Sequence, residues 1–266
     1  MFSRLARSKV IPATLVVAGF LIDRLNHSLC SPSISNYIDH TVLKPTCQEK
    51  DIKQLCNEAK QYNFAAVCVP PFWVPCAKRY VLGSNVKVAT VIGFPFGYSS
   101  VGSKAEEIKT ALVEGVDEVD IVANISAIKS HDYDFLYREI MELLAVIRSK
   151  PGVICKVIIE SGVLTNEEIV ECCKLYSAAG IDYLKTSTGY AEKGANIEAV
   201  KLFRDNLTPT IQIKASGGIR TYKDAKAMVE AGATRIGCSA GVNIVKEEMN
   251  AGTSTETAPS NPGGGY

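Results

Sequence analysis

Residues 153–185 carry the clearest signal of the fold and read VICKVIIESGVLTNEEIVECCKLYSAAGIDYLK. It starts with an apolar run over 153–159, continues with helical spacing over 166–179, and ends in a second apolar run over 181–185. Short runs rich in Val and Ile that are apolar on both faces are typical of buried parallel strands. Gly180 fits the end of the helix between them. The stretch therefore predicts one strand–helix–strand unit of an α/β protein.

The same alternation continues in both directions from this unit. Strands are predicted over 35–39, 64–69, 86–92, 118–123, 153–159, 181–185, 210–214 and 234–238. Helices are predicted over 48–62, 72–82, 104–114, 132–149, 166–179, 197–206, 222–231 and 242–249. Eight such pairs favour a single closed (β/α)8 TIM barrel over an open doubly wound sheet. The glycine fingerprints of dinucleotide-binding and P-loop proteins do not occur in the sequence.

The two ends of the chain do not follow the alternation. Residues 1–33 place basic residues before the apolar run Val10–Ile22, which is short for a membrane span. We expect an N-terminal extension there, either an extra helix or a targeting segment. Residues 250–266 are rich in Gly, Ser, Thr and Pro and are predicted to be a disordered tail. The predicted barrel domain is therefore 34–249.

The composition excludes several classes of function. The 266 residues carry 29 Lys and Arg against 28 Asp and Glu, which argues against a surface that binds nucleic acid through bulk positive charge. Nine cysteines without a C-x-x-C pair favour neither a disulfide framework nor a zinc ribbon, and unpaired cysteines are typical of a reducing compartment. We therefore expect a cytoplasmic protein, with organelle targeting by the N-terminal segment left open. With only three histidines, we expect no metal, and we expect no nucleic-acid or membrane partner.

Two lysines, Lys185 and Lys214, close consecutive predicted strands. Adjacent strands lie about 4.8 Å apart, so the two amines are expected to be neighbours at the C-terminal mouth, where such barrels carry their chemistry. Each cation disfavours the other, and burial acts the same way, so one amine is expected to lose its proton near neutral pH. A neutral lysine is a nucleophile for carbonyl carbon. The alternative is that both lysines extend from the strand ends to solvent, but Asp120, two strands away, favours a site.

A second signal is a set of small residues in turns after the last strands. Gly189 follows the sixth strand, Gly217 and Gly218 follow the seventh, and Ser239 closes the eighth before a helix. Barrels often bind phosphate at this place through backbone N–H groups and a helix N-terminus. The alternative is that the paired glycines only form a tight loop.

Five stretches that contain these residues resemble the deoxyribose-phosphate aldolases, which are class I aldolases of the (β/α)8 type. They occur in order along the chain and are Ile38–Pro45, Asp117–Asp120, Lys156–Glu160, Leu184–Gly189 and Lys214–Arg220. The Lys-Thr-Ser-Thr-Gly motif that begins at Lys185 is the most specific of them.

The resemblance implies a carbon–carbon lyase of deoxyribose catabolism that reversibly cleaves 2-deoxy-D-ribose 5-phosphate to D-glyceraldehyde 3-phosphate and acetaldehyde. It implies that Lys185 forms the Schiff base, that Lys214 keeps Lys185 unprotonated, and that Asp120 moves protons. Asp39 is implied to be a carboxylate near the same lysines. The implied phosphate-binding residues are Gly189, Gly217, Gly218 and Ser239. An imine accepts the electron pair of the breaking bond, so we expect no cofactor.

Two departures from the family bear on phosphate affinity. Tyr190 stands where some relatives carry a basic residue, and Ser239 is followed by Ala240 where some relatives carry a second serine. Another phosphate-binding barrel aldolase or epimerase, or a non-catalytic barrel that binds a ligand, is the alternative function. We expect sugar phosphates and aldehydes as partners, and a homodimer as the commonest assembly of soluble enzymes.

Overall fold

The computed structural model describes residues 33–253 of the chain. Within them, eight parallel strands pair in sequence order, and β1 pairs with β8 to close the barrel. The strands are β1 (Ile38–Thr41), β2 (Ala66–Val69), β3 (Lys87–Ile92), β4 (Glu118–Val122), β5 (Ile154–Ile158), β6 (Tyr183–Lys185), β7 (Gln212–Ser216) and β8 (Arg235–Cys238). The predicted (β/α)8 barrel is therefore confirmed.

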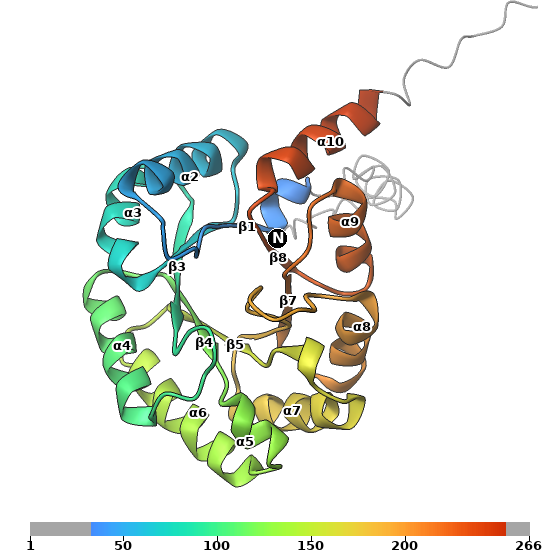
Figure 1. The fold of residues 1–266 in the computed structure, drawn as a ribbon. Coiled ribbons are helices and arrows are strands. Elements are labelled where there is room, and N and C mark those ends of the chain that lie inside the picture. Colours follow the sequence, from blue (N-terminus) through green and yellow to red (C-terminus); the bar gives the residue numbers. More distant parts are fainter. Residues whose placement is uncertain (1–32, 254–266) are drawn as a thin grey trace, which may run out of the picture. The chain divides into compact units, whose positions relative to one another are not determined.

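Helices form a ring around the strands (Figure 1). They are α2 (Glu49–Tyr62), α3 (Val74–Tyr80), α4 (Val101–Val113), α5 (Ile125–Lys129), α6 (Tyr133–Ile147), α7 (Asn166–Ala179), α8 (Ile197–Asn206), α9 (Tyr222–Glu230) and α10 (Gly241–Thr253). Three short 3-10 helices, η1 (Ile34–Tyr37), η2 (Pro71–Trp73) and η3 (Ser161–Val163), complete the elements. None of the helices in the described residues is long and apolar enough to cross a membrane.

Local capping explains why α7 has the bounds that the sequence predicts. The Thr165 side chain accepts a hydrogen bond from the Glu168 N–H, and the Glu168 side chain accepts one from the Thr165 N–H. This reciprocal arrangement satisfies two N–H groups at the start of the helix. At the other end Gly180 adopts a left-handed conformation, which a residue without a Cβ does without steric strain.

Several boundaries differ from the prediction. The first predicted strand begins instead as η1, where the Ile34 N–H donates to Glu248 of α10, and β1 starts at Ile38. The short helix α5 was not predicted. The strand β7 continues past Lys214 to Ser216, whose N–H donates to the Thr186 hydroxyl. The last helix α10 runs past residue 249 to Thr253, and the predictions for 1–32 and 254–266 lie outside the described residues.

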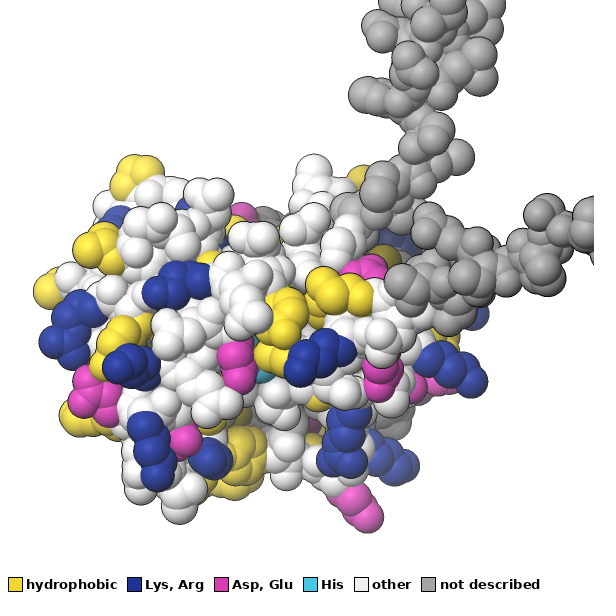
Figure 2. Space-filling model, turned by 90° about the horizontal axis from the view of Figure 1, so that it is seen from above, with side chains coloured by type: hydrophobic (Ala, Val, Ile, Leu, Met, Phe, Trp, Pro, Cys, Tyr) yellow, Lys and Arg dark blue, Asp and Glu magenta, His cyan; other side chains and the backbone are white. Residues whose placement is uncertain are grey.

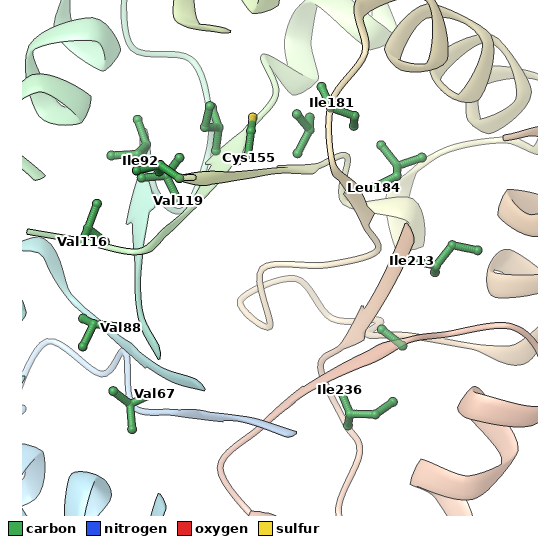
Figure 3. Packing of buried hydrophobic residues seen from close by; sticks show 14 of the residues in the cluster. Val67, Val88, Ile92, Val116, Val119, Cys155, Ile181, Leu184, Ile213 and Ile236 are labelled. Carbon is green, nitrogen blue, oxygen red and sulfur yellow. The ribbon is translucent and has the colours of Figure 1, made fainter. Parts of the chain in front are cut away.

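The main hydrophobic core lies between the strands and the helices. Strand residues point away from the barrel axis into this layer, as Figure 3 shows for Val67, Val88, Leu184, Ile213 and Ile236. Because successive side chains of a strand point to opposite faces, their neighbours point into the barrel. Inside, a small apolar cluster of Cys68, Ala89 and Val91 shares the space with charged side chains. Stability thus comes mainly from the outer layer, and the inner layer is available for chemistry.

The outer surface has no dominant sign of charge on the face that Figure 2 shows. Lys and Arg side chains are interspersed there with Asp and Glu. This agrees with the near-zero net charge of the sequence.

Candidate active site

Three lysines surround one carboxylate inside the barrel. Asp120 of β4 is fully buried, and its Oδ2 accepts hydrogen bonds from Lys185 Nζ and Lys214 Nζ, each at 2.7 Å. Its Oδ1 accepts a third, from Lys156 Nζ at 2.8 Å. The strand register pairs Asp120 with Lys156 and pairs Lys185 with Lys214. Four neighbouring strands, β4 to β7, therefore assemble this cluster.

A second set of buried ion pairs supports the first. Lys214 Nζ forms an ion pair with Asp39 Oδ2 at 2.5 Å. Arg235 donates to Asp39 Oδ1 at 2.7 Å and to both oxygens of Glu118, at 2.9 and 2.7 Å. Glu118 in turn lies 2.5 Å from Lys156. The cluster thus combines three carboxylates with four cations, namely Asp39, Glu118 and Asp120 with Lys156, Lys185, Lys214 and Arg235.

The surroundings distinguish Lys185 from the other two lysines. Burial lowers the pKa of Lys185, the nearby charge of Lys214 lowers it further, and Asp120 offsets this only in part. Burial also acts to lower the pKa of Lys214, but Asp120 and Asp39 outweigh it and raise that pKa. The pKa of Lys156 is likewise raised, because the carboxylates of Asp120, Glu118 and Asp39 outweigh its burial. Lys185 is therefore the amine that gives up its proton most easily.

Both aspartates stay ionised in this environment. Burial acts to raise the pKa of Asp39, but Arg235 and the nearby lysines hold it below its usual range. The pKa of Asp120 is held well below its usual range by its three lysines, again against burial. With all groups charged the cluster would carry one excess positive charge, so a neutral Lys185 leaves it balanced.

A pocket of about 410 Å³ opens at the C-terminal ends of the strands. Lys185 lines it, and so do the four residues predicted to bind phosphate, Gly189, Gly217, Gly218 and Ser239. The other predicted residues, Lys214, Asp120 and Asp39, are fully buried deeper in the barrel. The structure therefore brings together all eight predicted site residues, with the buried Lys185 lining the pocket and its electrostatic partners deeper in the barrel.

A family model described as DeoC/LacD family aldolase matches residues 34–247. The chain belongs to the DeoC/LacD family of aldolases. It is 49% identical over 215 residues to a deoxyribose-phosphate aldolase of Thermoanaerobacter sp. (strain X514), covering 81% of this chain and 96% of that one. It is 50% identical over 220 residues to one of Thermococcus gammatolerans, covering 82% and 97%.

A solved structure agrees with this assignment. The deoxyribose phosphate aldolase from Aeropyrum pernix, whose structure is described as a unique tetramer, is 30% identical to this aldolase and superposes with a TM-score of 0.77. The match covers 90% of this chain and 100% of that one. The predicted family is therefore confirmed.

Two glycines shape the pocket of the aldolase. At Gly217, which has φ +88, an added Cβ would lie 3.0 Å from the Cα of Gly194, so the turn requires a residue without a side chain. At Gly237 an added Cβ would lie 2.8 Å from Ser216 Cβ and 3.0 Å from Lys214 Cε. Gly237 thus leaves the space that the Lys214 side chain occupies.

Tyr190, the first departure from the family pattern, connects two loops at the edge of the pocket. Its hydroxyl donates to the carbonyl oxygen of Leu43 at 3.0 Å, and its ring packs edge-on against Phe94. The loop after β6 is therefore joined to the loop after β1 at a position where some relatives place a positive charge.

Three buried charges of the cluster were not predicted as site residues. They are Glu118, Lys156 and Arg235, each of which faces the barrel interior. The sequence could have indicated them, because each is a charged residue in an otherwise apolar strand. Each also lies on the face of the sheet that carries the predicted site residues. Lys156, for example, lies between the outward-facing Cys155 and Val157 and opposite Asp120 in the register.

Proposed function

We propose that this aldolase reversibly cleaves 2-deoxy-D-ribose 5-phosphate to D-glyceraldehyde 3-phosphate and acetaldehyde. One observation carries the proposal: the buried Lys185 amine, with its lowered pKa, opens into the same pocket as the glycine-rich turns. Such a pocket suits a substrate with a carbonyl at one end and a phosphate at the other. The deoxyribose-phosphate aldolases to which the chain is similar support this substrate.

The reaction starts with the unprotonated amine of Lys185. Its Nζ adds to the C1 carbonyl of the open-chain sugar, and the carbinolamine loses water to give a protonated imine. The C2–C3 bond then breaks. Its electron pair moves toward the imine to form an enamine, and the C3 hydroxyl loses its proton as C3 becomes the aldehyde of glyceraldehyde 3-phosphate. The enamine takes up a proton at C2, and water hydrolyses the new imine to release acetaldehyde and Lys185.

The neighbours of Lys185 support these steps in the proposed roles. Asp120 contacts Lys185 Nζ directly and exchanges protons with the reacting groups, through water where it does not reach them. Lys214 disfavours the proton on Lys185, and Asp39 keeps Lys214 charged. Backbone N–H groups of the turns at Gly189, Gly217, Gly218 and Ser239 bind the phosphate.

A coupled assay tests the proposal. The purified protein is given 2-deoxyribose 5-phosphate. An added dehydrogenase reduces the acetaldehyde that is released, and the rate of this reduction measures the release. Ribulose phosphates and phosphorylated keto acids serve as comparison substrates. Release of acetaldehyde from deoxyribose 5-phosphate alone is the expected result, and turnover of only a comparison substrate would contradict it.

We also propose a homo-oligomer in the cytoplasm. The tetrameric relative from Aeropyrum pernix supports an oligomer but leaves the predicted dimer open, and light scattering on the full chain distinguishes the two. The eight unpaired cysteines among the described residues support a reducing compartment. Imaging of the full chain in its own cell tests this localisation.

A further inference from the structure

Glu160 is a buried carboxylate beside the pocket that the steps above do not use. It lies two residues after β5, at the start of η3, in a left-handed conformation with φ 52, and it is only 6% exposed. Residues other than glycine seldom adopt this conformation, and when they do they often lie at functional sites. Burial raises the pKa of Glu160, while hydrogen bonds from Thr188 and the charge of Lys185 act against that rise.

Both hydrogen bonds of this carboxylate within the described residues come from Thr188. The Oε2 atom accepts the Thr188 N–H at 3.2 Å and also accepts the Thr188 hydroxyl in a short hydrogen bond. The Oε1 atom is buried without a hydrogen-bond partner in this part of the chain. A buried carboxylate is unfavourable unless it is paired, so the observed partners indicate what the residue does.

The hydrogen bond to Glu160 determines what the Thr188 hydroxyl can offer to a ligand. A hydroxyl has one proton and two lone pairs. The proton is donated to Glu160, and one lone pair accepts the N–H of Tyr190 at 3.0 Å. Thr188 lines the pocket together with Lys185 and Gly189. Its remaining lone pair can therefore only accept a hydrogen bond, which suits a hydroxyl of the substrate.

We propose that Glu160 is a positioning residue that makes the Thr188 hydroxyl an acceptor for the C4 hydroxyl of the sugar phosphate. This inference rests on the proposed function. The C4 hydroxyl is adjacent to the carbon that carries the phosphate, and Thr188 directly precedes Gly189, whose turn is proposed to bind that phosphate. The pair therefore selects aldehydes that carry a hydroxyl next to the carbonyl over those that do not.

The test compares 2-deoxyribose 5-phosphate with its analogue that lacks the C4 hydroxyl. Glu160→Leu and Thr188→Val each remove the hydrogen bond with little change of shape. For the natural sugar, each is expected to lower kcat/KM about 10- to 100-fold, as when one buried hydrogen bond is lost. For the analogue, each is expected to change kcat/KM less than about threefold, because the interaction is already missing.

Three further variants complete the design. Glu160→Gln keeps an acceptor oxygen and is expected to recover most of the preference for the natural sugar. The double variant Glu160→Leu with Thr188→Val is expected to lose no more than the worse single variant, because both remove the hydrogen bond between the Thr188 hydroxyl and Glu160, through which the C4 hydroxyl is selected. Glu142→Leu removes a carboxylate from an exposed position and is the matched control for the change in charge.

The possible outcomes separate the two proposals. Equal losses on both sugars, or additive losses in the double variant, would overturn the role of Glu160. If Glu160→Leu does not fold, Thr188→Val gives the same comparison. A Thr188→Val protein that keeps the full preference for the natural sugar over the analogue also overturns the role of Glu160. If the unmodified protein cleaves neither sugar, the proposed function itself is wrong.

Discussion

Lys185 and Lys214 donate to the same oxygen atom, Oδ2 of Asp120, each over 2.7 Å. They are register partners on neighbouring strands, yet the pKa of Lys185 is lowered and that of Lys214 is raised. The difference follows from Asp39, which lies 2.5 Å from Lys214 and stabilises its charge. Two chemically identical side chains therefore differ in how readily they release a proton, and this asymmetry is the basis of the first predictions.

Acetaldehyde and borohydride should label one lysine. The imine formed on Lys185 is reduced to an N-ethyl group, which peptide mass spectrometry locates in the segment that contains residues 185–189. Lys185→Met should lose both the label and turnover. An active protein labelled on Lys156 or Lys214 instead would contradict the role of Lys185.

Removal of Lys214 should shift the pH dependence of the reaction. Only unprotonated Lys185 reacts, so kcat/KM falls as the pH drops through the pKa of Lys185. Lys214 is one of the causes that lower this pKa, so in Lys214→Met the pKa rises and the acid limb moves to higher pH. At pH 7 we expect about a tenfold loss or more in kcat/KM. The exposed Lys201→Met is the control, and an acid limb at the original pH would contradict the role of Lys214.

The turn at Gly217 should affect how the aldolase binds the phosphate of its substrate. Gly217→Ala combines φ +88 with a Cβ 3.0 Å from Gly194 Cα, so the turn must move. We expect kcat/KM for 2-deoxyribose 5-phosphate to fall about tenfold, and that for unphosphorylated 2-deoxyribose to change less than about threefold. Gly83→Ala, at φ +78 with open space around it, has the same backbone strain and is the control. Similar losses on both sugars would argue against a phosphate turn.

Gly237→Ala should impair the reaction through Lys214. The new methyl group would lie 3.0 Å from Lys214 Cε and 2.8 Å from Ser216 Cβ, so the lysine is displaced from Asp120. A loss of about 10- to 100-fold in kcat is expected from a shift of this size, together with an acid limb at higher pH. Gly102→Ala in α4 meets nothing within 4 Å and should leave kcat unchanged. A Gly237→Ala protein with normal kcat would show that Lys214 needs no such space.

A buried ion pair outside the site should affect stability and not the reaction. Lys104 of α4 donates to Glu139 of α6 at 2.8 Å and to the carbonyl oxygen of Val122 at the end of β4, also at 2.8 Å. Lys104→Met leaves Glu139 buried and unpaired, which should lower the free energy of unfolding by about 3–5 kcal/mol. The double variant with Glu139→Leu should recover most of this in urea unfolding. A double variant as unstable as the single one would argue against the pair.

Two helices with local capping signals were predicted to the residue, whereas the capped helices α4 and α6 begin and end elsewhere than predicted. The helices α7 and α8 have the predicted bounds, because Thr165, Gly180 and Asn196 lie next to their ends and bind their free backbone groups. The end of β7 could not be predicted in this way. Its extension to Ser216 depends on pairing with β8, where Ser216 is the register partner of Gly237.

The site was predictable in its residues but not in its arrangement. Polar residues in or at the ends of apolar strands identified Lys185, Lys214, Asp120 and Asp39, and the closed barrel brings them together. Glu160 follows the end of β5, yet its hydrogen bonds to Thr188 depend on how the loops after β5 and β6 meet. No spacing in the sequence encodes that contact.

The sequence alone encodes the alternation of eight strands and helices, because periodicity and capping are local properties of the chain. It also determined which kinds of side chain enter the barrel, because successive strand residues face opposite sides. The resemblance pointed to Lys185, but the tertiary structure sets which of the two lysines has the lowered pKa. That choice depends on burial and on carboxylates far away in the chain, such as Asp120, which lies 94 residues before Lys214 and meets it only when the strands pair in register around the barrel.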